Sequence, residues 1–250
     1  MLPNWIKDRI AVNLPRQWAQ WVIWRSPKET EWSYLDRIVP RDMASVDVGA
    51  NIGIYTAALA KLTPTVHAFE PSTRLATLLR NSSLPNVCVH QQAVSDKPGT
   101  ATLRTPIQKD KLLASSLATL ETHNVNDTFT EETVSLIVLD DVISETVGFI
   151  KIDVEGHELK VLNGALRIIE AYRPIFLVEC EERHGAGNLR NLFAFFANKE
   201  YFGYFLKNGH LTSIDEFCQS RDQMRGTSDP YIYNFFFFPT QADLSFPKPL

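Results

Sequence analysis

The sequence has few cysteines and no long apolar run. Cys88, Cys180 and Cys218 are odd in number and show no CxxC spacing. This argues against a disulfide framework and a cysteine-based zinc site, and it favours a reducing compartment. No stretch approaches the roughly 18 consecutive apolar residues of a membrane span. Residues 1–5 lack the basic-then-apolar order of a signal peptide, so we expect a cytoplasmic protein without a membrane span.

The chain also lacks a strongly basic segment. It carries 25 Lys and Arg residues against 29 Asp and Glu residues, and its net charge is −4. Surfaces that bind nucleic acid are strongly basic, so we expect no nucleic-acid partner. The 250 residues, of which 44% are hydrophobic and 22% charged, are ordinary for one globular domain.

The tryptophans are confined to the start of the chain. All five (Trp5, Trp18, Trp21, Trp24 and Trp32) lie before residue 33. Trp18, Trp21 and Val22 follow helical spacing, which predicts an amphipathic helix over residues 15–24 within a cap of residues 1–40. Aromatic stripes of this kind usually face a core, so we expect this helix to pack on the main domain. A substrate lid, a dimer contact and a membrane-surface helix are alternatives, the last weakened by the few basic residues.

From residue 44 onward, strand and helix patterns alternate. This predicts a doubly wound α/β fold over residues 41–240, with a mostly parallel sheet of about seven strands. Strands are predicted at residues 44–48, 65–70, 86–94, 100–103, 149–154 and 175–179, and helices at 54–62, 72–82, 158–172 and 189–198. Residues 204–207 and 231–238 are predicted to form a terminal antiparallel pair.

One long segment of this domain lacks a clear pattern. Residues 104–132 are rich in Thr, Ser and Asn and weakly periodic. Long insertions of this kind in compact domains are usually mobile or functional, so we predict a substrate-facing insertion. Residues 241–250 are predicted to form a tail.

A loop with two glycines follows the first predicted strand. Gly49 and Gly53 allow a sharp turn and a close backbone approach to a ligand at the carboxyl end of that strand. A dinucleotide site has the spacing G-x-G-x-x-G, but Asp47 stands at its first glycine position. A carboxylate there would repel pyrophosphate and attract the amino group of a methionine moiety. The loop therefore favours S-adenosylmethionine (SAM) over NAD, with Asp47, Gly49, Asn51 and Gly53 as cofactor-binding residues.

Polar residues also follow the second and third predicted strands. Glu70 ends the second strand, where an acidic side chain can accept hydrogen bonds from ribose hydroxyls. Gln92 and Ala93 stand where an adenine ring would lie, and Asp96 is close to them in sequence. Both SAM and NAD carry ribose and adenine, so these residues do not choose between them. The competing interpretation is an ordinary tight turn with surface acids.

Three titratable residues follow the strand predicted at 149–154. Asp153, Glu155 and His157 should converge at the carboxyl edge of the sheet, because alternate strand residues share one face. A neutral histidine is a natural general base, and the acids could orient it or the substrate. The competing interpretations are a helix start favoured by acidic residues and a divalent cation bound by the carboxylates. We favour catalytic use without a metal ion.

Taken in order, these motifs resemble the FkbM-type methyltransferase family. The matching segments are residues 47–53 (DVGANIG), 69–71 (FEP), 93–96 (AVSD), 139–141 (LDD), 150–158 (IKIDVEGHE) and 173–174 (RP), followed by the strand to Glu179. The resemblance covers about residues 31–179, and the ordered set is far more specific than any one piece.

The resemblance implies a class I methyltransferase that uses SAM. It implies O-methylation of a small-molecule or glycan hydroxyl, on sugars, polyketides or related metabolites. It also places Ser115, Ser116 and Glu179 near the substrate. Family members often carry a small residue in place of His157, so Asp153 and Glu155 are the stronger catalytic candidates. An NAD-dependent oxidoreductase and a non-catalytic SAM-binding module remain the rival hypotheses.

Overall fold

The computed structural model describes residues 29–106, 118–121, 129–223 and 231–241. The helix predicted over residues 15–24, together with Ser115 and Ser116, lies outside these ranges. No helix within them is long and apolar enough to cross a membrane.

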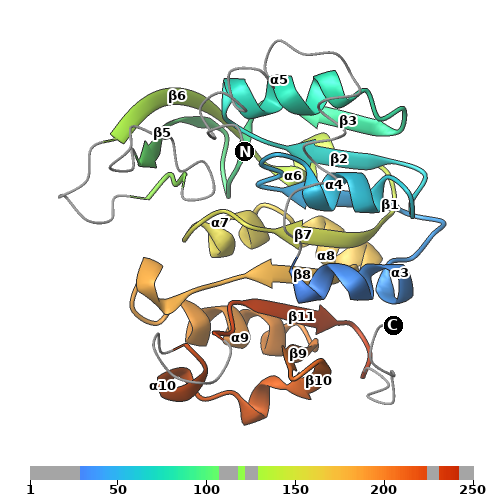
Figure 1. Cartoon of the computed structure of the whole chain (residues 1–250), viewed down its shortest axis with the longest axis vertical. Helices are drawn as coiled ribbons and strands as arrows, with labels where there is room; N and C mark the ends of the chain where they lie inside the picture. The colour runs from blue at the N-terminus through green and yellow to red at the C-terminus, as the bar shows by residue number, and fades with distance from the viewer. Residues whose placement is uncertain (1–28, 107–117, 122–128, 224–230, 242–250) are drawn as a thin grey trace, which may run out of the picture.

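A central sheet runs through the molecule with the strand order β10-β9-β11-β8-β7-β1-β2-β3 (Figure 1). Its strands are β1 (Ala44–Val48), β2 (Val66–Phe69), β3 (Val87–His90), β7 (Val147–Ile152), β8 (Ile175–Glu179), β9 (Phe202–Lys207), β10 (His210–Ser213) and β11 (Asn234–Phe238). The pairs from β3 to β8 are parallel, whereas β9, β10 and β11 pair antiparallel. This confirms the predicted doubly wound, mostly parallel fold with its terminal antiparallel pair.

The sheet has eight strands, one more than predicted, because the chain doubles back after β9. Asn208 and Gly209 both have positive φ angles, 53° and 75°. Two consecutive residues of this kind form the tight turns that match the twist of a hairpin, and β10 then pairs with β9. The sequence prediction missed β10 because this strand is short and mostly polar.

Helices cover both faces of the sheet. They are η1 (Thr30–Tyr34), α3 (Leu35–Ile38), α4 (Ile54–Leu59), α5 (Thr73–Ser82), α6 (Leu139–Val142), α7 (Glu158–Asn163), α8 (Leu166–Tyr172), η3 (Glu182–His184), α9 (Asn188–Asn198), η4 (Ile214–Glu216) and α10 (Gln219–Asp222). Strand β11 shows the two faces directly. Phe235 and Phe237 pack in the core with α7, α8 and α9, whereas Phe236 and Phe238 pack in the core with α3 and α4.

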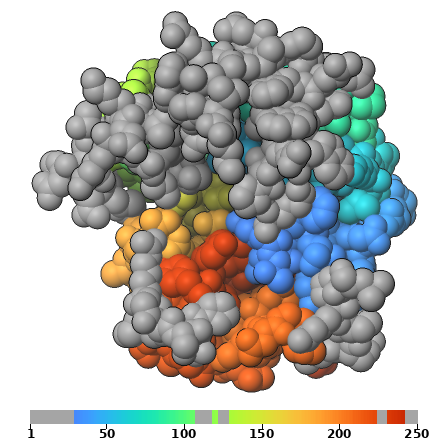
Figure 2. Space-filling view, in the orientation of Figure 1, coloured from blue at the N-terminus to red at the C-terminus, as the bar shows by residue number. Residues whose placement is uncertain are grey.

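The start of the described chain packs against its end. Tyr34 lies 6.5 Å from Phe236 between ring centroids, and Glu29 accepts a hydrogen bond from Asn234. Figure 2 shows these early residues, in blue, beside the red and orange C-terminal strands. Residues 29–40, assigned by sequence to an N-terminal cap, therefore share a core with the main domain.

The helix predicted over residues 158–172 is two helices, α7 and α8, separated at Gly164. A Cβ atom at Gly164 would lie 2.2 Å from the Ser95 carbonyl oxygen, so the backbones approach too closely for a side chain. The Asp140 carboxylate accepts hydrogen bonds from the backbone N–H groups of Arg167 and Ile168, which begin α8. Tertiary contacts with Ser95 and Asp140 thus place the break.

A second sheet, with strand order β4-β6-β5, contains β4 (Ala93–Val94), β5 (Gly99–Pro106) and β6 (Phe129–Ile137). Both ends of the predicted insertion at 104–132 therefore belong to strands. The prediction missed them because both strands are largely polar and mostly unburied, so they lack the alternation of a half-buried strand. The strand predicted at 86–94 divides between the two sheets.

Candidate active site

A pocket opens at the carboxyl ends of β1, β2, β3 and β7, where open α/β sheets bind their ligands. It is lined by Val48, Gly49, Asn51, Phe69, Glu70, Pro71, Gln92, Ala93, Val94, Leu103, Ala118, Leu120, Asp153, Val154, Glu155 and His157. These side chains come from both sheets, from the loop after β1 and from residues 118–121. Among the residues that the structure describes, the lining has apolar, acidic and neutral polar side chains and His157, but no lysine or arginine.

The pocket brings together eight of the residues predicted from sequence. From the cofactor set these are Gly49, Asn51, Glu70, Gln92 and Ala93, and from the catalytic set Asp153, Glu155 and His157. Three further cofactor candidates, Asp47, Gly53 and Asp96, are not among the lining residues. Gly53 precedes α4 with a φ angle of 89°, and Asp96 lies 3.2 Å from the Ser95 hydroxyl.

The loop after β1 approaches the end of β7 very closely. Gly49 has a φ angle of 80°, and a Cβ atom there would lie 1.8 Å from the Asp153 carbonyl oxygen. The Gly49 N–H donates to the Phe69 carbonyl, which ties the loop to β2 as well. Gly49 is therefore the contact point of three strand ends.

Glu70 is held in place by backbone donors. Its Oε2 accepts from the N–H of Asn51 at 2.8 Å, and its Oε1 accepts from the N–H of Ser72 at 2.9 Å. Burial raises the pKa of Glu70 to about 7. A carboxylate fixed in this way is a preorganised acceptor for a diol such as a ribose.

Asp47 lies beneath the loop and not on the pocket surface. It is 1% exposed, and its Oδ2 accepts a hydrogen bond from the Thr56 hydroxyl at 2.5 Å. Burial raises the pKa of Asp47 to about 6, while the Thr56 hydrogen bond acts in the opposite direction. Asp47 therefore lies outside the pocket surface, behind the loop that lines it.

These buried acids make the stability of the ligand-free protein depend on pH. The folded state binds the Glu70 proton more tightly than the unfolded chain, because the pKa rises from 4.5 to about 7. Ionising Glu70 therefore lowers the free energy of unfolding by on the order of 3 kcal/mol as the pH rises through this range. Relative to the natural protein, Glu70→Gln should become more stable as the pH increases from about 5 to about 8. Urea unfolding at both pH values checks this, and a difference independent of pH would contradict it.

A second group of acids flanks the pocket at the ends of β7 and β8. Burial raises the pKa of Asp153 to about 7 and that of Glu179 to about 9. Asp153, Glu155 and Glu179 offer carboxylate oxygens within 4.8 Å of one another. The sequence predicted that Asp153, Glu155 and His157 converge at this edge. All three line the pocket, but the close group of carboxylates contains Glu179, and His157 contacts Ser95 and Glu121 instead.

A buried cation lies beside these acids, and the sequence analysis did not single it out. Lys151, in β7, is 1% exposed; its Nζ donates to Asn234 Oδ1 at 3.1 Å and lies 5.0 Å from the centre of the Tyr55 ring. Glu29 Oε2 accepts from the Tyr55 hydroxyl at 2.6 Å and from Asn234 Nδ2 at 3.0 Å, which closes a polar network. The sequence did carry a signal for this buried cation, namely a lysine inside an otherwise apolar strand. A charged side chain is buried only when polar or oppositely charged groups pair with it.

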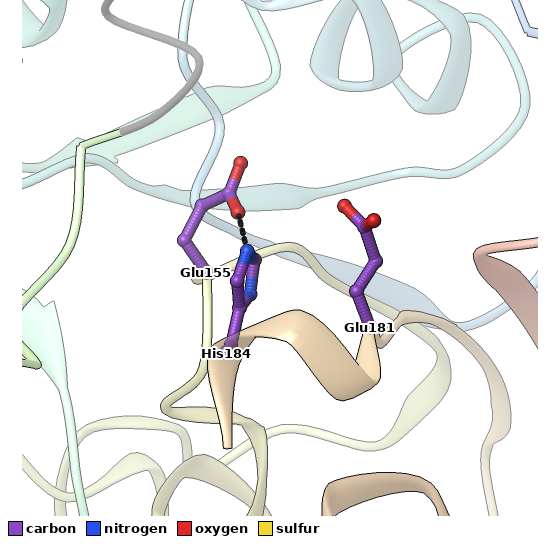
Figure 3. Close-up of side chains that lie close together, drawn as sticks. All are labelled: Glu155, Glu181 and His184. Atoms are coloured by element: carbon purple, nitrogen blue, oxygen red, sulfur yellow. Dashed lines mark ion pairs between the residues drawn. The ribbon is translucent and has the colours of Figure 1, made fainter. Parts of the chain in front are cut away.

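The Glu155 carboxylate pairs with His184, whose side chain extends toward it from the η3 turn (Figure 3). The Nε2 of His184 lies 2.9 Å from Glu155 Oε2, and Arg183 Nη2 lies 3.5 Å from the same oxygen. Arg183 also contacts Glu181 at 2.5 Å, and Glu181 accepts from the Tyr231 hydroxyl at 2.6 Å. Glu155, Glu181 and His184 have the spacing of metal ligands, but the carboxylates already have donors within the protein.

His157 is buried and has a protein partner on each ring nitrogen. Its Nε2 lies 2.9 Å from the Ser95 hydroxyl, and its Nδ1 lies 2.6 Å from Glu121 Oε1. Burial lowers the pKa of His157, which favours the neutral ring. A neutral ring with its proton on Nδ1 donates to Glu121 and accepts from Ser95, so both partners are satisfied.

The fold is the one found in class I methyltransferases. The chain belongs to the family whose model is described as the Methyltransferase FkbM domain, which matches residues 47–210. Membership confirms the resemblance seen in the sequence and assigns SAM as the methyl donor, in preference to NAD. No curated protein matches the chain significantly.

Solved structures agree on the fold. The chain is similar to the methyltransferase FkbM from Methylobacillus flagellatus KT, with 18% identity and a TM-score of 0.52, over 94% of this chain and 59% of that chain. A weaker similarity is to an rRNA methylase from Streptococcus thermophilus, with 10% identity and a TM-score of 0.46, over 87% of this chain and 98% of that chain. Another is to a putative methyltransferase from Streptococcus mutans in complex with S-adenosylhomocysteine (SAH), with 8% identity and a TM-score of 0.47, over 85% of this chain and 99% of that chain. At these identities the similarity concerns the fold, and it rests on the first structure.

Proposed function

We propose that the chain transfers a methyl group from SAM to a hydroxyl of a sugar, glycan, polyketide or related metabolite. The observation that carries the proposal is the pairing of a fixed carboxylate, Glu70, with Asp153 and Glu155 across one pocket. The described part of the pocket wall has acids and no lysine or arginine, which suits a ribose and a positively charged sulfonium. It suits pyrophosphate poorly, because phosphate sites use cationic side chains or free N–H groups.

The lining residues fit the parts of SAM separately. The backbone at Gly49 and Asn51 would hold the methionine end, and Asp47 beneath it would supply negative charge. Glu70 would accept from the ribose hydroxyls. Gln92 and Ala93 would contact the adenine, with Leu103 and Leu120 supplying apolar walls. Asp96, whose carboxylate lies beside the Ser95 hydroxyl, would accept a hydrogen bond at the edge of the adenine region.

Bound SAM supplies a methyl group that is already strongly electrophilic, so the protein mainly positions the acceptor. Asp153 is proposed as the group that takes the proton from the acceptor hydroxyl, at a carboxylate oxygen. Its pKa of about 7, raised by burial, is suited to a general base at neutral pH. Glu155 and Glu179 would accept hydrogen bonds from the acceptor. Lys151 keeps a positive charge behind the acids and helps to hold Asp153 ionised.

Isotope-labelled SAM tests this proposal directly. The protein would be incubated with labelled SAM and fractionated metabolites or cell-envelope glycans, and the label followed into base-stable ethers. Binding of SAM without transfer to any fraction would favour the non-catalytic module. Binding of NADH without SAM in a calorimetric titration would overturn the methyltransferase assignment.

Glu70→Gln is expected to weaken SAM binding by about 10- to 100-fold, because a charged acceptor is lost from a buried site. Isothermal titration with SAH measures the change without an acceptor. Glu170→Gln is a matched control, because Glu170 is exposed on α8 and pairs with Lys199. Equal affinity of Glu70→Gln and the natural protein would remove Glu70 from the ribose site.

A further inference from the structure

Residues 118–121 form one wall of the pocket, and a small set of polar contacts holds them there. Ala118 and Leu120 line the pocket, as Gly49 and Asn51 of the loop after β1 do. The N–H and carbonyl of Thr119 pair with the backbone of Arg104 at 3.0 and 2.9 Å. The Thr119 hydroxyl donates to the Glu155 carbonyl at 2.8 Å. The wall is thus tied to β5 on one side and to the turn after β7 on the other.

His157 provides the buried part of this connection. It links Glu121, at the end of the wall, to Ser95, which follows β4. Lys160 Nζ contacts the same oxygen of Glu121 at 2.9 Å, so the carboxylate is held by two donors. Ser95 is itself fixed, because its N–H donates to the Ile137 carbonyl at 2.8 Å.

The order Ser95, His157, Glu121 resembles the connectivity of a hydrolase triad, but the geometry argues against a nucleophile. Ser95 is 2% exposed and does not line the pocket, so no substrate carbonyl can reach its hydroxyl. His157 lines the pocket, yet both ring nitrogens are occupied by protein partners. The arrangement is therefore suited to holding structure together.

We infer that His157 is a positioning residue that joins residues 118–121 to the loop at Ser95 and so builds the adenine side of the cofactor pocket. Ala93, in β4 two residues before Ser95, and Leu120, on the wall, both line the pocket. If both residues are fixed before the ligand binds, the entropic cost of ordering them on binding is smaller. The residue thus acts on SAM affinity through Ser95 and Glu121, and Asp153 is left as the base. The inference rests on SAM binding in this pocket, but on no particular acceptor.

Titration calorimetry with SAH tests the inference with a graded series. His157→Ala should raise the Kd for SAH about tenfold, because both connections are lost and the wall is no longer preorganised. The amide nitrogen of asparagine can take the place of Nδ1, so His157→Asn should keep the contact with Glu121 and bind within about threefold of the natural protein. His210→Ala, an exposed histidine on β10, is the matched control and should bind unchanged.

A double-mutant cycle separates positioning from simple loss of packing. Glu121→Ala alone should weaken SAH binding, but in the His157→Ala background it should add little, because the two residues act through one contact. If His157→Ala fails to fold, the Glu121 variant tests the same contact from its other side. The Glu121 side chain is 26% exposed, so its replacement disturbs the core less.

Three results would overturn the inference: normal affinity in His157→Ala, equal weakening by alanine and asparagine, or independent effects of His157 and Glu121. Failure of the natural protein to bind SAH would overturn the proposed function, and the inference with it. Normal SAH binding without methyl transfer would leave the expected affinity pattern in place and remove only the proposed reaction.

Discussion

Gly49→Ala is expected to abolish SAM binding, with a loss of at least about 100-fold in affinity. The added Cβ atom would lie 1.8 Å from the carbonyl oxygen of Asp153 and 2.8 Å from its carbonyl carbon. Both are backbone atoms, so the loop after β1 and the end of β7 must separate. That movement displaces the backbone proposed to hold the cofactor and the residue proposed as the base. Calorimetric titration with SAH measures the loss.

Gly187→Ala separates this clash from the cost of the backbone conformation. Gly187 has a φ angle of 85°, close to the 80° of Gly49, but a Cβ atom there meets nothing nearer than 3.4 Å. It should lower stability by about 1 kcal/mol and leave SAH binding unchanged. If Gly49→Ala bound SAH as well as Gly187→Ala does, the close contact with Asp153 would not shape the cofactor site.

Asp153→Asn is expected to lower the rate of methyl transfer by about 10²- to 10⁴-fold while SAM binding is retained, because the amide cannot accept the proton. Steady-state rates with labelled SAM and the acceptor found by fractionation measure this change. Asp141→Asn, an exposed acid after β6, is the matched control. Near-normal turnover in Asp153→Asn would show that another group takes the proton.

The natural enzyme should also lose activity in acid with an apparent pKa near that of Asp153. Burial raises this pKa to about 7, and the carboxylate must be ionised to act as a base. The rate therefore rises with pH through about 7 and then levels off. In Asp153→Asn, the residual rate should lack this acidic limb. An acidic limb that persisted in the variant would belong to a different group.

The carboxyl ends of the parallel strands could be located from sequence because the evidence is local. A buried apolar run followed by glycine or an acid marks the end of a strand, and parallel strands place these ends at one edge. This is why the predictions for Gly49, Glu70, Gln92 and Asp153 coincide with one pocket. The order of motifs along the chain was sufficient to indicate the family and its cofactor.

The surroundings of those residues depend on contacts between distant segments, which leave no local pattern. Lys151 looks like an isolated charge in a strand until Asn234, Tyr55 and Glu29 are brought around it by the sheet order. Strand β5 was predicted only over residues 100–103, and β6 was not predicted, because both strands are largely polar and their alternation is weak.

His157 illustrates the difference between what local sequence predicts and what distant contacts decide. By itself, the sequence determined the doubly wound fold, the cofactor loop and an acidic cluster with a histidine, because these follow from periodicity, glycine conformation and strand direction. Only the tertiary structure decided that the histidine is buried between Ser95 and Glu121, because those partners are 62 and 36 residues away along the chain. A side chain's chemistry follows from its residue type, but its availability depends on which groups the fold places against it.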